Sequence, residues 1–215
     1  MLHADVNIDE QYYDQRLDHF NEAQNATWKQ RYWVNDEFFD GTGPVFLMIG
    51  GEGEENPIWL KMGQWVNFGK SFNALLVLVE HRFYGKSHPT YDLSVDSLKY
   101  LSSKQALADL ASFRMFIYSK YNLTEWNKLI SFGGSYPGSL SAWFRLKYPH
   151  MVHAAVASSA PMLALLDFTD YLLVVNQSLT SYNPKCVDMI YNAHQEVIGL
   201  MGDAEGRQVL RTEFQ

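Results

Sequence analysis

The residues with the clearest chemical potential lie in segment 129–138, which reads LISFGGSYPG. An apolar run leads into two glycines, then Ser135, and then a helical pattern. This strand–turn–helix context is that of a nucleophile elbow, in which a sharp turn lifts a serine hydroxyl above the edge of a sheet. The N–H of Tyr136 and the positive end of the following helix would face the oxyanion that forms when the serine attacks a carbonyl. We therefore predict that Ser135 is a nucleophile; the alternative is an ordinary glycine-rich turn.

Two further features bear on the oxyanion. The usual form of this turn has glycine two positions after the serine, where this sequence has Pro137. Proline is accepted in the first turn of a helix, but it biases the preceding Tyr136 away from helical geometry. A second oxyanion N–H is expected from the turn 50–53, GGEG, and we take Gly51 as the candidate because glycine lets the backbone approach a substrate. A plain tight turn explains this segment equally well.

The segment 80–85, EHRFYG, follows another apolar run. Polar groups at the carboxyl ends of parallel strands border the ligand crevice in α/β sheets. We interpret Glu80 and Arg82 as one satisfied polar group that, with Tyr84, shapes the floor of the site. Direct catalysis by His81 is the less favoured interpretation, because in this kind of fold the base follows the serine along the chain.

A serine nucleophile needs a base, and the base needs an acid that orients it. After Ser135 the candidate base is His194, and the candidate acids are Asp167, Asp170 and Asp188. None of them has the expected strand-then-loop context, and His194 lies in a helical pattern. We therefore expect the catalytic Asp and His to be absent from this sequence.

Four apolar runs are predicted to be buried strands: 44–50, 74–79, 129–132 and 152–157. Helical spacing separates them at 58–72, at 102–118 behind a capping box of Ser102 and Gln105, and at 133–148. Before these, residues 11–28 are expected to be an irregular arm and 30–35 a strand. Strands that are apolar on both faces and alternate with helices predict a parallel sheet in an α/β domain. Beyond residue 162 only helical patterns occur, including 186–201 and a helix from Asp203.

Composition excludes several classes of protein. Apolar residues make up 47% of the 215 residues, which is enough for a core, and the net charge of −7 argues against binding nucleic acid. The sequence predicts no membrane span, no signal peptide at residues 1–5, no metal-ligand cluster and no cofactor. Asn25, Asn122 and Asn176 begin glycosylation sequons, and Cys186 is the single cysteine.

Three motifs together resemble one family: GGSYPGSL at 133–140, EHRFYG at 80–85 and QRLDHFN at 15–21. It is the serine peptidase family of lysosomal Pro-Xaa carboxypeptidase, dipeptidyl peptidase II and thymus-specific serine protease. The resemblance covers the chain from about Tyr12 into the last helices. The variant with Pro137 is most similar to the thymus-specific branch.

The resemblance implies the N-terminal part of an α/β-hydrolase fold over 1–165, followed by the beginning of a helical cap over 166–215. Ser135 would be the nucleophile of an exopeptidase of dipeptidyl peptidase or carboxypeptidase type, acting in lysosomes or outside the cell. The family's Asp and His follow the cap, so we expect this sequence to be an N-terminal fragment. Cys186 would pair with a later cysteine, and the full-length parent would bind peptides, with a homodimer left open. The alternatives are an esterase on the same fold, a non-catalytic isoform that binds peptides or a partner, and an incomplete gene product.

Overall fold

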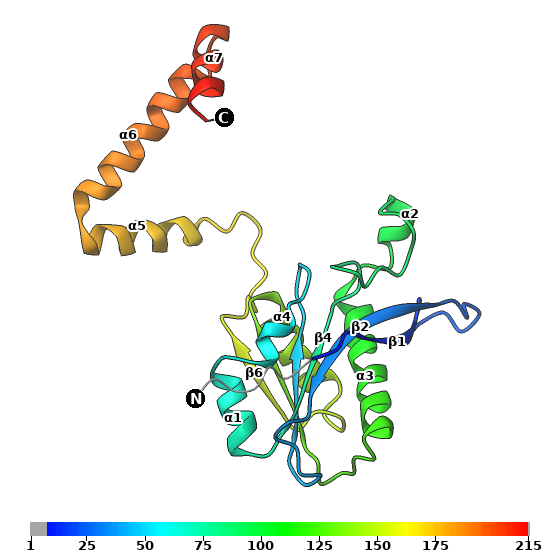
Figure 1. Cartoon of the computed structure of the whole chain (residues 1–215). Helices are drawn as coiled ribbons and strands as arrows, with labels where there is room; N and C mark the ends of the chain where they lie inside the picture. Colours follow the sequence, from blue (N-terminus) through cyan, green and yellow to red (C-terminus); the bar gives the residue numbers. More distant parts are fainter. Residues whose placement is uncertain (1–7, 215) are drawn as a thin grey trace. The chain divides into compact units, whose positions relative to one another are not determined.

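A computed structural model describes residues 8–214, so residues 1–5, where a signal peptide was sought, lie outside the described residues. The chain forms two compact units, Met1–Met162 and Leu163–Gln215. Figure 1 shows the first as a sheet with flanking helices and the second as helices alone. No helix within residues 8–214 combines the length and apolar character that crossing a bilayer requires.

One mixed sheet organises the first unit, with strand order β1-β2-β4-β3-β5-β6. Its strands are β1 (Gln11–Arg16), β2 (Thr27–Asn35), β3 (Val45–Ile49), β4 (Leu75–Val79), β5 (Leu129–Gly134) and β6 (Ala154–Ser158). β3 pairs in parallel with β4 and β5, and β5 pairs in parallel with β6. β1 and β2 form an antiparallel hairpin whose second strand joins β4. The predicted parallel sheet is thus confirmed for the four later strands.

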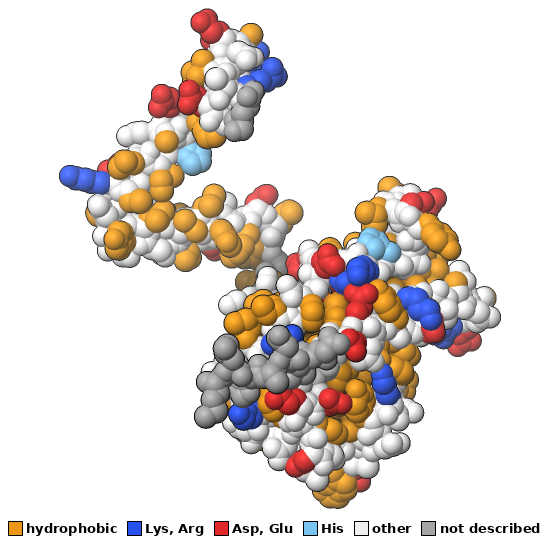
Figure 2. Space-filling view, viewed as in Figure 1, with side chains coloured by type: hydrophobic (Ala, Val, Ile, Leu, Met, Phe, Trp, Pro, Cys, Tyr) orange, Lys and Arg blue, Asp and Glu red, His pale blue; other side chains and the backbone are white. Residues whose placement is uncertain are grey.

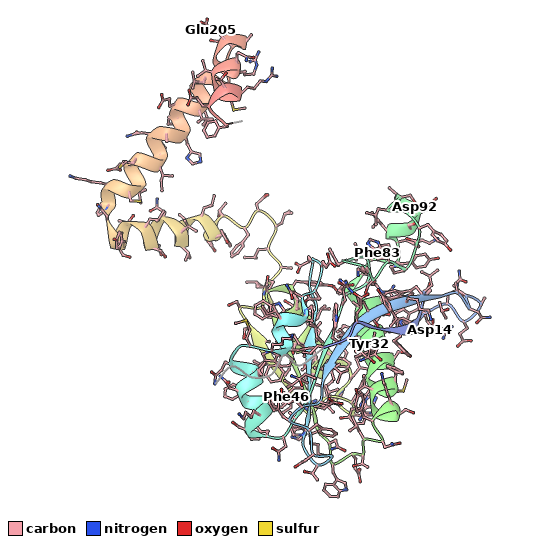
Figure 3. The ribbon with its side chains drawn as sticks, viewed as in Figure 1. Asp14, Tyr32, Phe46, Phe83, Asp92 and Glu205 are labelled. Atoms are coloured by element: carbon pink, nitrogen blue, oxygen red, sulfur yellow. The ribbon has the colours of Figure 1, made fainter. Side chains whose placement is uncertain are left out.

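Helices cover both faces of this sheet. They are the 3₁₀ helix η1 (Pro57–Leu60), α1 (Gln64–Ser71), α3 (Ser103–Lys120) and α4 (Tyr136–Lys147), while the short helix α2 (Val95–Leu98) has no buried residue. On one face Leu47 and Val77 pack in a cluster with residues of α3 and α4, including Phe113 and Phe144. On the other face Phe46 packs with Leu60 of η1 and with Trp65 and Val66 of α1. The alternation along each strand therefore divides the core into two layers, and Figure 3 labels Tyr32 in the first and Phe46 in the second.

The second unit consists of α5 (Asp170–Tyr182), α6 (Pro184–Leu200) and α7 (Ala204–Glu213). Asp203 caps α7 by accepting from the Gly206 N–H, as the predicted helix start requires. No side chain of α5 or α6 is buried, and hydrophobic side chains line these helices in Figure 2. α6 contacts α5 and α7, but these contacts leave every residue of α5 and α6 at least partly exposed.

Several predicted elements differ from the structure. Residues 11–28 were expected to be an irregular arm, but Gln11–Arg16 is a strand, because β2 extends to Thr27 and pairs with it. The single helix predicted over 58–72 is broken into η1 and α1 at Gly63, whose φ is +103°. The buried strand predicted over 152–157 is β6, which is largely exposed because it forms an edge of the sheet. The short helix α2 was not predicted.

The capping box before α3 is half right. Ser102 accepts from the Gln105 N–H at 3.2 Å, as the prediction requires. The Gln105 side chain does not return to Ser102: its Nε2 donates to Asp18 and its Oε1 accepts from the His19 N–H. Gln105 therefore fixes the segment that joins β1 to β2 instead of completing the cap.

Candidate active site

Ser135 occupies the sharp turn between β5 and α4. Its φ and ψ are +58° and −131°, a combination that costs an L-residue conformational energy and persists only where the surroundings impose it. The Ser135 N–H donates to the carbonyl oxygen of Ser158 in β6 at 3.0 Å, which fixes the turn to the neighbouring strand. The residue is exposed at the carboxyl end of the parallel strands. The backbone thus presents the Ser135 hydroxyl to solvent above the edge of the sheet.

Two residues explain how strand and helix pass so closely. A Cβ on Gly133 would lie 2.2 Å from the carbonyl oxygen of Pro137, so only glycine fits there. Pro137 lies within the first turn of α4, where its missing N–H has no helical acceptor to lose. The helix nevertheless begins at Tyr136, so the proline does not displace that residue from the helix. The Tyr136 N–H is therefore one of the free donors of the α4 N-terminus.

The Tyr136 side chain is held from two sides. Its hydroxyl lies 3.1 Å from Nε2 of His81 and 3.0 Å from Oγ of Ser103, the first residue of α3. Nδ1 of His81 donates to the Arg82 carbonyl at 2.7 Å, which leaves Nε2 as an acceptor for the Tyr136 hydroxyl. Burial lowers the pKa of His81 and raises the pKa of Tyr136, so it favours the neutral form of both groups. His81 therefore supports the elbow through Tyr136.

Gly51 lies against the elbow, but its N–H is already engaged. A Cβ on Gly51 would lie 2.7 Å from Cγ of Pro137, so the turn after β3 touches the start of α4. The Gly51 N–H donates to Oε1 of Glu55 at 3.0 Å. Burial raises the pKa of the Glu55 carboxyl. Gly51 can serve a substrate oxyanion only after it exchanges this carboxylate partner.

Glu80 and Arg82 do not form the single polar group that we predicted. Both are fully buried, but Glu80 accepts from Nε and Nη2 of Arg31, while Arg82 donates to both carboxylate oxygens of Asp109 at 2.6 and 2.7 Å. Strand alternation would place residues 80 and 82 on the same side, but Arg82 already lies in the turn that follows β4, so its side chain takes a different direction. Asp109 also accepts from His19 at 2.7 Å. Two separate ion-pair centres thus anchor the loops beneath the site.

Tyr84 is half-buried beside His81, with ring centroids 5.3 Å apart. Its N–H donates to the His81 carbonyl in the tight turn that ends at Gly85. The structure therefore places Tyr84 next to the residue that supports Tyr136. Its role in shaping the site stays a prediction.

The candidate base and acids all lie in the second unit. His194 is exposed on α6, and its Nδ1 donates to the Ile190 carbonyl of the preceding turn at 2.8 Å. Three aspartates were candidate acids, and all are exposed: Asp167, Asp170 and Asp188. The first unit therefore holds the candidate nucleophile and one candidate oxyanion donor, and the candidate base and acids belong to the other unit.

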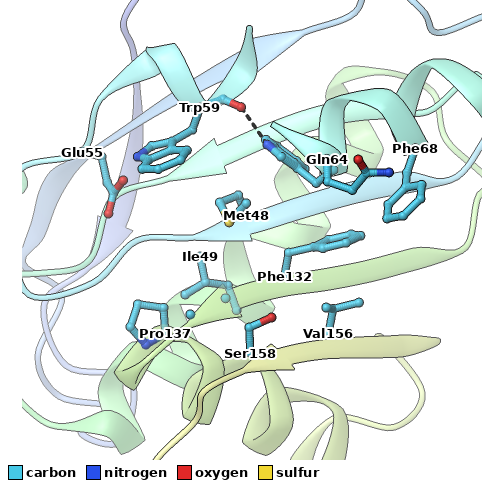
Figure 4. Close-up of a pocket in the computed structure, with 13 residues that line it drawn as sticks. Met48, Ile49, Glu55, Trp59, Gln64, Phe68, Phe132, Pro137, Val156 and Ser158 are labelled. Carbon is cyan, nitrogen blue, oxygen red and sulfur yellow. Dashed lines mark hydrogen bonds between the residues drawn. The ribbon is translucent and has the colours of Figure 1, made fainter. Parts of the chain in front are cut away.

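A groove of about 570 Å³ lies beside the elbow (Figure 4). Its lining is mostly apolar and aromatic, and the polar side chains Glu55 and Gln64 lie among it. The lining residues are Met48, Ile49, Glu55, Trp59, Gln64, Trp65, Phe68, Phe132, Gly133, Gly134, Pro137, Val156 and Ser158.

Sequence reasoning missed Ser103 and Asp109. Both lie in α3, and the helical spacing of apolar residues there does not indicate which distant residue either one contacts. The structure brings Ser103 to the elbow and Asp109 to Arg82. The only available signal was an acidic residue, Asp109, among the apolar residues on one face of a predicted helix.

The sequon residues Asn25, Asn122 and Asn176 are all exposed, and their glycosylation stays a prediction. Cys186 is a free thiol in the described structure.

A serine on a strained strand-to-helix turn, in a largely parallel sheet with helices on both faces, defines an α/β-hydrolase. Among solved structures, the thioesterase domain from the curacin biosynthetic pathway matches with a TM-score of 0.51 and 14% identity, over 80% of this chain and 52% of that one. The chain belongs to the serine carboxypeptidase S28 family, which matches residues 15–215.

Named relatives agree with this family. The thymus-specific serine protease of Mus musculus is 44% identical over 207 residues, which are 94% of this chain and 41% of the mouse protein. The lysosomal Pro-X carboxypeptidase of Homo sapiens is 35% identical over 207 residues, or 93% of this chain and 42% of the human protein. The chain therefore spans about two fifths of the length of these relatives. The resemblance inferred from the three motifs is confirmed.

Proposed function

We propose that this chain carries the nucleophile of a serine exopeptidase that cleaves peptides by acyl transfer. The observation that supports this most directly is the strained, exposed backbone of Ser135 at the start of α4. Ser135 Oγ attacks the peptide carbonyl, the Tyr136 N–H donates to the oxyanion, and a histidine accepts the serine proton and passes it to the leaving amine. Acyl transfer to water then releases the second product and the free serine.

The histidine and its aspartate are proposed to come from the part of the family's length that this chain does not span. This agrees with the chain covering 41% of the mouse relative and 42% of the human one. Residues from 166 onward are proposed to begin a helical cap. Gly51 is proposed as the second oxyanion donor, in which case Glu55 must release its N–H when substrate binds.

The substrate class is proposed from the names of the relatives. One is named as a lysosomal Pro-X carboxypeptidase, which supports a prolyl-type exopeptidase of the lysosomal or secretory system. Carboxypeptidase and dipeptidyl peptidase activity remain equal alternatives for the parent enzyme, because residues 8–214 contain no group that we can assign to either terminus of a peptide.

Labelling with a fluorophosphonate probe tests the nucleophile. We expect slow labelling of the 215-residue chain that Ser135→Ala abolishes, because without its base a protease keeps at most about 10³–10⁴-fold rate enhancement over water. Ser159→Ala is the matched control, since Ser159 is also exposed and has a positive φ of 48°. Labelling that survives Ser135→Ala would contradict the nucleophile, and fast labelling of the wild-type chain would contradict the missing base.

A second candidate function also starts from the exposure of Ser135 at the end of the sheet. A non-catalytic chain would bind peptides at the open carboxyl edge of the sheet without any need for the serine. Peptide affinity that is the same for wild type and Ser135→Ala, without probe labelling of either, would favour this candidate. An esterase on the same fold would instead show turnover of ester substrates but not of dipeptides by an enzyme with a complete triad.

A further inference from the structure

A second hollow lies at the edge of the sheet opposite to Ser135. It has a volume of about 250 Å³ and contains Leu129 and His153 in its lining, so it lies where β5 and β6 begin. Its walls come from the second half of α3 and from the loops 125–128 and 149–153, all within the first unit. β5 begins in this hollow and ends beside Ser135, so the length of the strand separates the two places.

Arg114 of α3 brings a fixed positive charge into the lining. Its guanidinium carbon lies 3.6 Å from the ring centroid of Tyr118, one helical turn further on, so the ring holds the guanidinium in place. Tyr118 is itself buried, and its hydroxyl donates to the Asn127 carbonyl. The Nε atom of Arg114 is buried and has no hydrogen-bond partner among residues 8–214. Buried donors normally have a partner, so this Nε marks a position for an acceptor atom of a ligand.

The loops around the hollow are held by hydrogen bonds of their own. The Asn127 side chain donates to the carbonyls of Gly41 and Gly43 at 3.1 and 2.9 Å. The His153 N–H donates to the Leu129 carbonyl at 2.8 Å, which ties the loop 149–153 to the start of β5. The walls are therefore in place without a ligand, and a ligand would not have to order them.

The lining carries more groups that can be positive than negative. Four of its side chains can carry positive charge: Arg114, Lys128, His150 and His153. Glu125 is the one carboxylate among the lining residues, and no salt bridge within residues 8–214 engages it, Arg114 or Lys128. The whole chain has a net charge of −7, so this concentration of cations runs against its overall balance. A hollow lined by cations without carboxylate partners attracts anions.

We propose that this hollow binds a phosphate group, either as free inorganic phosphate or as part of a phosphomonoester. Arg114 would donate through its planar fork, while Lys128 and the two histidine rings would approach from the loops. Donors from three segments of the chain suit the three or four oxygens of a phosphate better than the two of a carboxylate. A water molecule takes about 30 Å³ of the liquid, so the hollow has space for a phosphate group with a small organic group attached. This proposal does not depend on the catalytic role of Ser135.

Isothermal titration calorimetry of the full 215-residue chain with sodium phosphate tests the proposal. We expect a dissociation constant of about 1 mM or below, and Arg114→Gln should raise it tenfold or more, because glutamine has neither the charge nor the fork. Lys128→Gln should raise it severalfold without changing the melting temperature, since Lys128 is exposed. Arg211→Gln is the matched control, because Arg211 is an exposed arginine of α7, and this variant should bind phosphate as wild type does.

Parallel titrations with phenyl phosphate and acetate identify the ligand. Affinity for phenyl phosphate tenfold above that for phosphate would assign the site to a phosphomonoester, and equal or lower affinity would assign it to free phosphate. Acetate should bind at least tenfold more weakly than phosphate. Circular dichroism establishes that Arg114→Gln is folded, and Lys128→Gln decides the question if it is not.

Three results would overturn the proposal. They are no phosphate binding by the wild-type chain, binding that the folded variants do not weaken, and acetate binding as tight as that of phosphate. Probe labelling of Ser135 is measured separately, so failure here is distinct from failure of the peptidase assignment.

Discussion

The helices α3 and α6 have similar sequence patterns, but they differ in how much of each helix is buried. Both are long, of 18 and 17 residues, and both repeat apolar residues at helical spacing. α3 buries ten of its residues against the sheet, whereas α6 buries none. Helical spacing therefore predicts the helix in both cases, but burial depends on a partner surface. Within its own unit α6 contacts α5 and α7, and these contacts bury none of its residues.

The largest expected difference between the two helices is in the free energy of unfolding lost when an aspartate is replaced by alanine. Asp109→Ala in α3 leaves Arg82 fully buried without its carboxylate, and removing one partner of such a pair costs about 3–5 kcal/mol. Asp188→Ala in α6 removes an exposed carboxylate and should change the free energy of unfolding by less than about 0.5 kcal/mol. Urea denaturation followed by tryptophan fluorescence and circular dichroism measures both. Equal effects of the two variants would contradict the contrast between the units.

The next largest difference is expected when an isoleucine is replaced by alanine in each of the two helices. Ile117→Ala in α3 should lower the free energy of unfolding by about 2–4 kcal/mol, because Ile117 is 1% exposed and its removal leaves a cavity. Ile190→Ala in α6 should cost less than about 0.5 kcal/mol, since Ile190 is 42% exposed. The same denaturation experiments apply. A large loss for Ile190→Ala would show that α6 has a partner surface in solution.

A smaller effect concerns strain within the first unit. Ser135→Gly should raise the free energy of unfolding by about 1 kcal/mol, because glycine adopts a φ of +58° without penalty and this relief exceeds its extra entropy in the unfolded chain. Ser97→Gly in α2 is the control and should be neutral or destabilising. Thermal denaturation distinguishes them. If Ser135→Gly lowers the melting temperature, the turn is not strained.

The smallest effect is a pH dependence. Burial raises the pKa of Glu55 in the folded state. As the pH rises, the unfolded chain therefore loses the Glu55 proton before the folded chain does. The free energy of unfolding then falls between the unfolded pKa, about 4.3, and the raised folded-state pKa. Glu55→Gln keeps an acceptor for the Gly51 N–H but carries no charge. The variant should be slightly more stable at pH 7, by less than about 1 kcal/mol, and no more stable than wild type at pH 4. Melting temperatures at both pH values measure the difference.

The sequence predicted the parts of the molecule that depend on local patterns. The continuous apolar runs gave β3, β4 and β5, and the glycines before Ser135 predicted the turn that the structure shows. What it could not predict depends on distant pairing. The strand Gln11–Arg16 alternates weakly and is a strand because β2 lies beside it. The pairing of Arg82 with Asp109 joins residues 27 positions apart, and nothing in either segment identifies the other.

The site shows the same division. Ser135 and the helix that follows it are local features, so the motif located them. The support of Tyr136 by His81 and Ser103 brings together three segments, and Glu55 occupies the Gly51 N–H through the shape of a loop. Such contacts follow from the fold as a whole, which is why Glu80 and Arg82 bind different partners, Arg31 and Asp109, instead of forming the single polar group that was predicted.

The contact between Gly51 and Pro137 has a consequence for how this protein can change over time. Any side chain at position 51 would collide with the proline ring, at 2.7 Å from Cγ. The two positions are therefore coupled: a side chain at 51 requires the proline ring or the turn after β3 to shift, and its cost should fall when position 137 carries no ring.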